Sequence, residues 1–409
     1  MLLSLQKSKL VSGKTLQITG SKSESNRLLL LQALFPEIKI LNLSNSDDTV
    51  LMKEALSSEA EVVDIHHAGT AMRFLTAFFA VKPKREVVLT GSQRMKERPI
   101  GILVEALQTL GADISYLEKQ GYPPLKIRGR NINKSQVRLK ANVSSQYISA
   151  LLLIAPVLKR GLTIELEGTV TSVPYINMTL SLLNQLGIET SFNGQFIKVY
   201  PFNKTLSAEK VIEVESDWSS ASYFYSFIAL SDVGTEIILK SYKSNSLQGD
   251  AILAKLYREF GVETVFEGTA IRLKKSDTVE EESSLEIDLS NAPDIAQTIA
   301  VTAFGLQKPI HLTGLHTLKI KETDRLVALK NELTKLGAQI EITANSLELK
   351  ATQSIKPNVA IATYNDHRMA MAFAPLALRT SIVIEDADVV SKSYPSFWDD
   401  LQSIGIILK

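Results

Sequence analysis

Charged residues gather at several points in the chain in combinations that could bind an anion and move a proton. Lys-Glu-Thr-Asp-Arg at 321–325 places cations on both sides of Glu322, and Asp294 stands at an expected helix start after Pro293. Glu322 and Arg325 are expected three residues apart on one helical face, where they could also form a surface ion pair that contributes little. Lysine and arginine bind carboxylate and phosphate groups, and arginine does so through two parallel hydrogen bonds. A carboxylate held among these cations can exchange a proton once a bound anion offsets the positive charge. The pattern therefore indicates acid–base chemistry on an anionic substrate.

Further cations stand close to the starts of predicted helices. They are Lys22, Arg27, Arg73 and Arg368. A positive side chain is unfavourable there, because the first backbone N–H groups of a helix already carry partial positive charge and attract anions. A helix cap with solvated charges would explain any one of these clusters. Their recurrence favours a protein that binds small polyanions.

The clusters recur at a nearly constant interval. They begin near Thr70, Ser145, Ser219, Asp294 and Asp366, at intervals of 72 to 75 residues, and each opens an apolar helical run. A sixth and shorter unit begins at Ser21. Helical runs that end in glycine recur in step with them, at Gly111, Gly187, Gly261 and Gly337. A glycine closes a helix in the left-handed conformation, and two strand-like segments follow each one.

The repeat predicts an α/β protein built from six units of helix, strand, helix, strand, turn and strand. At ~75 residues a unit is about twice the length of a solenoid repeat. Three units per domain give two domains of ordinary size, and the join between the third and fourth units is expected near 210–217. A chain of 409 residues also exceeds the usual size of one hydrophobic core.

Composition excludes several classes of function. Lys and Arg number 45 against 44 Asp and Glu, so the net charge of +1 offers no field that would attract nucleic acid or an anionic membrane. The absence of cysteine excludes disulfides, thiolate metal sites and cysteine nucleophiles. The five histidines lack the spacing of a metal site. Residues 1–20 do not have the pattern of a secretory signal, and the apolar run 148–158 is too short to cross a bilayer. We therefore expect a cytoplasmic protein.

Taken together, the motifs resemble those of the 5-enolpyruvylshikimate-3-phosphate (EPSP) synthase family. The resemblance covers nearly the whole chain, in the same order. The motifs are Ser-Lys-Ser-Glu-Ser-Asn-Arg at 21–27, Ala-Gly-Thr-Ala-Met-Arg at 68–73, Arg-Met-Lys-Glu-Arg-Pro at 94–99, Ser-Ser-Gln at 144–146, Gln-Gly-Asp at 248–250, Pro-Asp at 293–294, Lys-Glu-Thr-Asp-Arg at 321–325 and Asn-Asp-His-Arg-Met-Ala-Met at 365–371.

The resemblance implies two inside-out α/β domains, each with three repeated helix–strand units in pseudo-threefold symmetry and with the active site in the cleft between them. It assigns residues 21–214 to one domain and residues 1–20 plus 215–409 to the other. The implied reaction transfers the enolpyruvyl group of phosphoenolpyruvate to the 5-hydroxyl of shikimate 3-phosphate, in chorismate and aromatic amino acid biosynthesis. It needs no metal or cofactor, is inhibited by glyphosate, and is expected of a monomer.

The resemblance also implies roles for individual residues. Asp294 would accept the hydroxyl proton, and Glu322 with Lys22 would handle the proton of the methylene carbon. The cations for phosphoenolpyruvate would be Lys22, Arg94, Arg325, Arg368 and Lys392, with Gly69 and Arg73 at the border of its pocket. Shikimate 3-phosphate would contact Ser23, Arg27, Ser144, Ser145, Gln146, Ser172, Tyr175 and Lys321. Thr70 and His367 complete the expected substrate-binding set, to which Asp294 also belongs.

The chain departs from the family pattern at a few positions. His67 stands where Asn usually precedes Ala-Gly-Thr, and Thr317 and Lys319 replace a polar pair before Lys-Glu. Lys392 is matched only through the short motif Ser-Lys-Ser-Tyr-Pro. Two alternatives stay open. A sister enolpyruvyl transferase for a UDP-amino sugar would carry a reactive cysteine in a mobile loop, and a non-catalytic anion binder would need the cations without the carboxylates.

Overall fold

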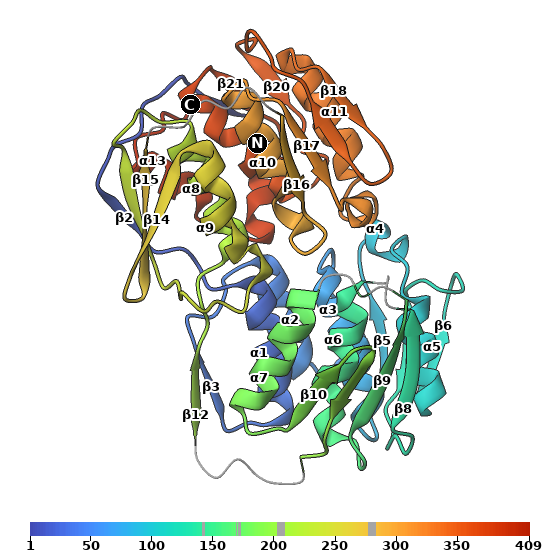
Figure 1. Ribbon diagram of the computed structural model, residues 1–409. Coiled ribbons are helices and arrows are strands. Elements are labelled where there is room, and N and C mark those ends of the chain that lie inside the picture. The colour runs from blue at the N-terminus through green and yellow to red at the C-terminus, as the bar shows by residue number, and fades with distance from the viewer. Residues whose placement is uncertain (141–143, 169, 171–172, 203–208, 277–283) are drawn as a thin grey trace. The chain divides into compact units, whose positions relative to one another are not determined.

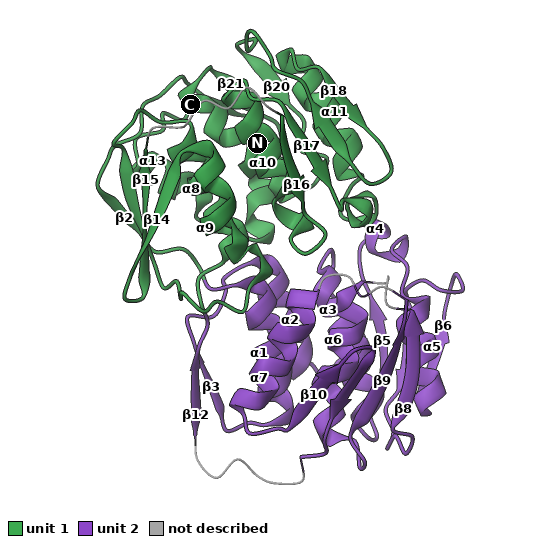
Figure 2. Cartoon of the chain, viewed as in Figure 1, with its two compact units in different colours: residues 1–19, 215–409 green, residues 20–214 purple. Residues whose placement is uncertain are grey.

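The computed structural model describes residues 1–140, 144–168, 170, 173–202, 209–276 and 284–409. The chain forms two compact units (Figure 2). Unit 1 consists of Met1–Thr19 and Glu215–Lys409, and unit 2 of Gly20–Val214. The sequence placed the boundaries after residues 20 and 214, and the compact units divide after residues 19 and 214.

Unit 2 alternates helices and strands along the chain. Its helices are α1 (Lys22–Leu34), α2 (Asp47–Ser57), α3 (Gly69–Val81), α4 (Gln93–Lys96), α5 (Gly101–Leu110), α6 (Ser145–Ile154) and α7 (Val173–Gln185). Its strands are β3 (Ile38–Leu41), β4 (Val62–Asp64), β5 (Glu86–Thr90), β6 (Asp113–Tyr116), β7 (Leu125–Arg128), β8 (Gln136–Lys140), β9 (Leu162–Glu167), β10 (Thr190–Asn193), β11 (Phe196–Val199) and β12 (Lys210–Glu213).

Unit 1 repeats this alternation. Its helices are α8 (Trp218–Ala229), α9 (Leu253–Leu256), α10 (Ala296–Gly305), α11 (Arg325–Leu336), α12 (His367–Phe373) and α13 (Phe397–Ser403). Its strands are β1 (Leu3–Leu5), β2 (Lys14–Leu16), β13 (Glu236–Lys240), β14 (Val262–Glu267), β15 (Ala270–Lys275), β16 (Leu285–Asp288), β17 (Ile310–Thr313), β18 (Ile340–Ile342), β19 (Leu347–Leu349), β20 (Val359–Ile361) and β21 (Ile382–Ile384).

Within the described residues the strands form six sheets, three in each unit, and the same topology recurs among them. In β4-β5-β7-β6 the first pair is parallel and the next two pairs are antiparallel. The same sequence of pairings occurs in β8-β9-β11-β10, β2-β13-β15-β14 and β16-β17-β19-β18. The remaining sheets, β12-β3 and β1-β21-β20, each keep one parallel pair. The expected α/β class with repeated units is confirmed.

The most completely buried helices form the interior of each unit, with the sheets around them (Figure 1). In unit 2, α1, α3 and α6 pack against one another, and α8, α10 and α12 do so in unit 1. Every residue of α10 is buried, which requires apolar or small residues on all its sides. The strands alternate instead between buried and exposed residues, because only one face of each sheet meets the core. Among the described helices, none is long and apolar enough to cross a membrane.

The predicted glycine stops are confirmed. Gly111, Gly187, Gly261 and Gly337 all have positive φ, the conformation that ends a helix at little cost only for glycine. One predicted helix start is wrong. We expected Glu322 and Arg325 on one helical face, but the side chain of Asp324 accepts hydrogen bonds from the N–H groups of Leu326 and Val327, so that α11 begins at Arg325.

Candidate functional site

Arg325 lies at the centre of an acidic cluster in unit 1. Its Nε is 2.7 Å from Asp366 Oδ2, its Nη1 is 2.9 Å from Asp294 Oδ1, and its Nη2 is 2.8 Å from Glu322 Oε2. The arginine side chain is 2% exposed and that of Asp366 is fully buried. One guanidinium thus holds carboxylates from three different segments of unit 1.

This geometry corrects one expectation about Arg325. Its ion pair with Glu322 could have been a weak surface pair, but the guanidinium is 2% exposed and the carboxylate of Glu322, in the bend before α11, is 23% exposed. The hydrogen bonds of Arg325 to described residues go to Asp366, Asp294 and Glu322. The role in binding phosphoenolpyruvate that the resemblance assigned to Arg325 stays a prediction.

Asp294 is surrounded by positive charge. It lies in the 3₁₀ helix η4 (Pro293–Ile295), directly before α10, with its side chain 18% exposed. Lys321 Nζ is 3.2 Å from its Oδ1, and Arg368 Nη2 is 3.6 Å from its Oδ2. Burial by itself would raise the pKa of Asp294, but the charges of Lys321, Arg368 and Arg325 outweigh it and hold that pKa well below its usual range. Asp294 is therefore ionised at neutral pH in this structure.

Arg368 and His367 open α12 beside this cluster. The side chain of Asp366 caps the helix by accepting the Arg368 N–H at 2.9 Å. Arg368 Nη1 donates to the backbone oxygen of Asp294 at 2.9 Å, and His367 is 3% exposed. Lys392 Nζ donates to the backbone oxygen of Asn365 at 2.7 Å. The structure thus brings Lys392 next to the start of α12.

In unit 2, the expected residues at the start of α1 have protein partners. Lys22 Nζ is 3.5 Å from Asp48 Oδ2, at the start of α2. Arg27 is 2% exposed, and its Nε and Nη2 donate to Thr179 Oγ1 at 2.8 Å and Ser149 Oγ at 3.0 Å. Burial lowers its pKa to about 10. A bound anion is therefore not needed to explain these two cations.

Arg27 also organises two other expected residues. Its Nη1 donates to the backbone oxygen of Ser23 at 2.8 Å, and its Nη2 donates to that of Tyr175 at 3.4 Å. Because Ser149 and Thr179 belong to α6 and α7, this single side chain joins α1 to both helices. Ser172 lies outside the described residues.

The starts of α3 and α6 meet in the same unit. Gln146 Nε2 donates to Thr70 Oγ1 at 3.1 Å. The side chain of Ser144 caps α6 by accepting the Gln146 N–H, and Ser145 is the first residue of that helix. Arg73 is 5% exposed, and its Nη1 donates to the backbone oxygen of Gly69 at 3.0 Å. These contacts hold two helix starts side by side.

Arg98, the second arginine of the motif at 94–99, is not among the site residues expected from the sequence. A methyl group added to Gly69 would lie 2.6 Å from Arg98 Nη1, so this guanidinium covers the start of α3. The second arginine of the motif was the signal that could have indicated it. Arg94, which we selected instead, is half exposed and 3.3 Å from Glu97 Oε2.

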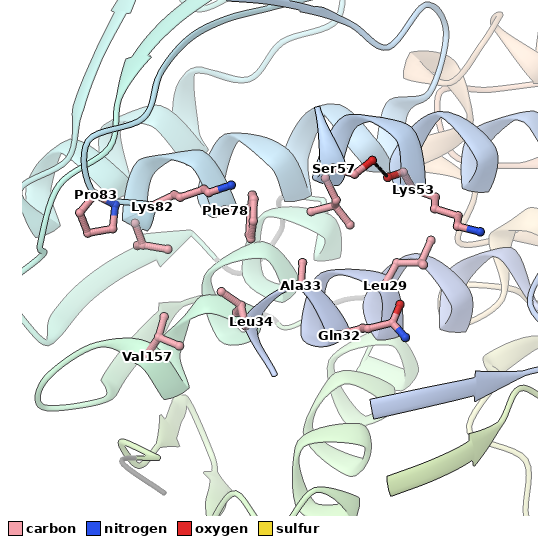
Figure 3. Close-up of a pocket in the computed structure, with 12 residues that line it drawn as sticks. Leu29, Gln32, Ala33, Leu34, Lys53, Ser57, Phe78, Lys82, Pro83 and Val157 are labelled. Carbon is pink, nitrogen blue, oxygen red and sulfur yellow. Dashed lines mark hydrogen bonds between the residues drawn. The ribbon is translucent and has the colours of Figure 1, made fainter. Parts of the chain in front are cut away.

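A separate cavity of about 560 Å³ opens in unit 2 (Figure 3). It is lined by the C-terminal halves of α1, α2 and α3, including Leu29, Lys53 and Phe78, and by none of the expected site residues. The expected residues stand at the opposite, N-terminal ends of α1 and α3. In the described part of the chain, no group of three or more His, Cys, Asp or Glu side chains is arranged to hold a metal ion.

Comparisons with known proteins give one consistent result. The family model described as EPSP synthase (3-phosphoshikimate 1-carboxyvinyltransferase) matches residues 53–401. A 3-phosphoshikimate 1-carboxyvinyltransferase of Bacteroides fragilis is 46% identical over 400 residues, which cover 97% of this chain and 96% of the relative. The fold is similar to that of EPSP synthase from Acinetobacter baumannii, with a TM-score of 0.80, 21% identity and coverage of 100% and 99%. It is also similar to the enolpyruvyl transferase NikO from Streptomyces tendae, with a TM-score of 0.77, 14% identity and coverage of 100% and 98%.

Proposed function

Because this chain belongs to the EPSP synthase family, we propose that it transfers the enolpyruvyl group of phosphoenolpyruvate to the 5-hydroxyl of shikimate 3-phosphate and releases phosphate. The observation that carries the proposal is the placement of Asp294 among Lys321, Arg325 and Arg368. The proposal includes a monomeric, cytoplasmic enzyme whose ligands are these two small anions.

The reaction has two steps that this chain's residues can serve. In the addition, Asp294 accepts the hydroxyl proton, the freed oxygen bonds to C2 of phosphoenolpyruvate, and the C3 methylene takes up a proton. In the elimination, C3 loses a proton, the C2–C3 double bond re-forms, and the bond from C2 to the phosphate oxygen breaks. We assign the proton transfers at C3 to Glu322 and Lys22, by resemblance to the family.

A bound anion could turn the ionised carboxylate of Asp294 into an effective base, because the cations around it would then be partly neutralised. A carboxylate with a strongly lowered pKa is a weak proton acceptor. A phosphate or carboxylate group that binds Lys321 and Arg368 would offset part of the field that lowers the pKa of Asp294. The pKa of Asp294 would then rise toward neutral pH when the substrate is bound, so that proton transfer begins only in the loaded site.

Unit 2 offers complementary binding groups. The backbone N–H groups at the starts of α1, α3 and α6 have no partner inside their helices, and hydroxyl groups surround them. We propose that Ser23, Ser144, Ser145 and Gln146 bind shikimate 3-phosphate there. Ser172 lies outside the described residues, so its expected role in binding shikimate 3-phosphate stays a prediction.

The first prediction is turnover without added metal. We expect phosphate release only when shikimate 3-phosphate and phosphoenolpyruvate are both present, at a rate that a chelator leaves unchanged, because protein cations neutralise the substrates. A coupled phosphate-release assay measures it, with a UDP-amino sugar as the control acceptor. The proposal would be contradicted if the enzyme used the UDP-amino sugar but not shikimate 3-phosphate as acceptor, or if the chelator abolished activity.

The second prediction concerns Gly69→Ala. The added methyl group would lie 2.6 Å from Arg98 Nη1, so the guanidinium has to shift, and the methyl group itself enters the space at this helix start where the ligand is expected. Glyphosate is longer than phosphoenolpyruvate, and we therefore expect its inhibition constant to rise by about 10-fold or more, with a smaller rise in KM for phosphoenolpyruvate. Inhibition curves of both proteins measure the two changes.

Gly101→Ala is the matched control for Gly69→Ala. Gly101 also begins a helix of unit 2, but the nearest atom to an added methyl group would be the Cα of Gly121, at 3.3 Å. Its glyphosate inhibition should stay at the wild-type level. Equal weakening of both ligands by Gly69→Ala would show that the methyl group does not discriminate between them.

A further inference from the structure

Asp250 is a buried carboxylate with an unusual lack of partners. It lies in the 3₁₀ helix η2 (Gly249–Ile252) and is 3% exposed. Its Oδ2 accepts a hydrogen bond from the hydroxyl of Ser219, whereas no described residue donates a hydrogen bond to its Oδ1. A buried carboxylate oxygen without a donor is costly to the fold, so its retention calls for an explanation.

The neighbouring Glu215 shows how this region satisfies a structural carboxylate. It is 2% exposed. Its Oε1 accepts from Trp218 Nε1 and the Lys243 N–H, both at 2.8 Å, and its Oε2 accepts from Ser246 Oγ at 2.5 Å. Gln248 Nε2, at 3.3 Å, is a further donor to Oε2. Asp250, two residues after Gln248, has a different environment.

Asp250 is connected to Asp294 through two side chains. Because the Ser219 hydroxyl donates its proton to Asp250, its oxygen is left to accept from Arg368 Nη2 at 3.2 Å. The same guanidinium donates from Nη1 to the backbone oxygen of Asp294 at 2.9 Å and lies 3.6 Å from its carboxylate. The order Asp250, Ser219, Arg368, Asp294 therefore forms a continuous polar chain.

The backbone around Asp250 is fixed by its own motif. Gln248, of Gln-Gly-Asp at 248–250, accepts the Trp218 N–H at 2.9 Å and donates to the backbone oxygen of Ser216 at 2.9 Å. Both contacts lie at the start of α8, where Ser219 stands in the first turn. The motif thus holds Asp250 against Ser219.

The electrostatic surroundings make Asp250 responsive to pH. The pKa of Asp250 is raised to about 6, chiefly because the carboxylate is buried. The negative charges of Asp294 and of Asp217, the cap of α8, contribute to this increase, whereas Arg368 and the Ser219 hydroxyl oppose it. An ionised Asp250 is therefore held at a cost to folding stability above this pH.

We propose that Asp250 is a positioning residue for the reaction inferred above: acting through Ser219, its carboxylate orients the guanidinium of Arg368 against Asp294. The inference rests on the proposed function. In this role Asp250 acts through Ser219 and not by contact with the substrate. It fixes the hydroxyl proton of Ser219, so that the hydroxyl oxygen accepts from Arg368 Nη2 while Nη1 donates to the backbone oxygen of Asp294.

The kinetic test is Asp250→Asn, which keeps the shape and removes the charge. At pH 7.5 we expect kcat/KM for phosphoenolpyruvate to fall by about 10-fold or more, with KM for shikimate 3-phosphate within about twofold of wild type. The wild-type rate should also decline as pH falls through about 6, where Asp250 takes up a proton. The phosphate groups of the substrates also titrate in this range, and this part of the decline is common to the wild type and Asp250→Asn. The part of the decline that is seen in the wild type and missing from Asp250→Asn is due to Asp250.

Thermal unfolding separates positioning from a structural role. The pKa of Asp250 is raised from 3.8 to about 6 on folding, so the stability that the protonated carboxyl contributes is lost progressively between these two pH values. The cost to folding stability is therefore partial at pH 5 and complete at pH 8. Asp250→Asn should therefore raise Tm more at pH 8 than at pH 5. The matched variant Glu215→Gln should lower Tm at both pH values and leave the shape of the pH–rate profile unchanged. Ser219→Ala breaks the same chain from the other side and should reproduce the kinetic loss.

Each outcome decides the inference. It is overturned if Asp250→Asn keeps the wild-type kcat/KM and pH profile, or loses Tm at both pH values as Glu215→Gln does. If the wild type itself releases no phosphate, the proposed function fails independently. Calorimetric binding of inorganic phosphate then tests the link between Asp250 and Arg368: weaker binding by Asp250→Asn supports it, and equal binding overturns it.

Discussion

Asp294→Ala is expected to lower the turnover number by about 10²-fold or more, the usual effect of removing a general base. Both substrates should still bind. Because the variant removes a negative charge from beside Lys321 and Arg368, the local positive potential rises, and the affinity for phosphoenolpyruvate should stay the same or increase. Steady-state phosphate release gives the turnover number, and calorimetry gives the affinity.

Glu322→Gln tests the second carboxylate in the same assay, with a similar expected loss in turnover. Asp324→Asn is the matched control, because it also removes one negative charge from this segment while asparagine can still cap α11. Its turnover should stay near the wild-type value. If Asp294→Ala or Glu322→Gln remains folded but no longer binds the substrates, the role of that carboxylate is binding and not proton transfer.

Arg325→Met is expected to cause a large loss of folding stability in unit 1. The side chain is buried among Asp294, Glu322 and Asp366, and the variant would leave these carboxylates without their shared cation. Removing one partner of a buried ion pair costs about 3–5 kcal/mol. Both tryptophans of the chain, Trp218 and Trp398, lie in unit 1, so their fluorescence in a denaturant titration reports on this unit.

Two variants serve as controls for Arg325→Met. Arg272→Met removes an arginine that also pairs with two carboxylates, Glu236 and Glu267, but its side chain is 30% exposed, and the expected loss is below about 1 kcal/mol. Arg325→Lys keeps the charge without the planar fork and should fall between the two. Equal stability of Arg325→Met and the wild type would mean that the three carboxylates find other partners.

The sequence by itself determined the repeated architecture. Helix starts, glycine stops and strand pairs are encoded by residues that are close together in the chain, and their period revealed six units. Gly111 and Gly337, for example, end helices at the predicted positions because a left-handed residue is a local requirement. The motifs that carry the family resemblance are local in the same sense.

Only the tertiary structure decided which charged groups share an environment. The partners of Arg325 come from segments at residues 294, 322 and 366, and the buried chain from Asp250 to Asp294 joins four separate segments. Arg98 likewise covers Gly69, although the two residues are far apart in the chain. Burial and charge pairing depend on how the repeats pack, and the energy of an ion pair changes severalfold between water and the interior. No pattern of neighbouring residues could therefore have shown that Arg325 is buried, or that Oδ1 of Asp250 accepts no hydrogen bond from any described residue.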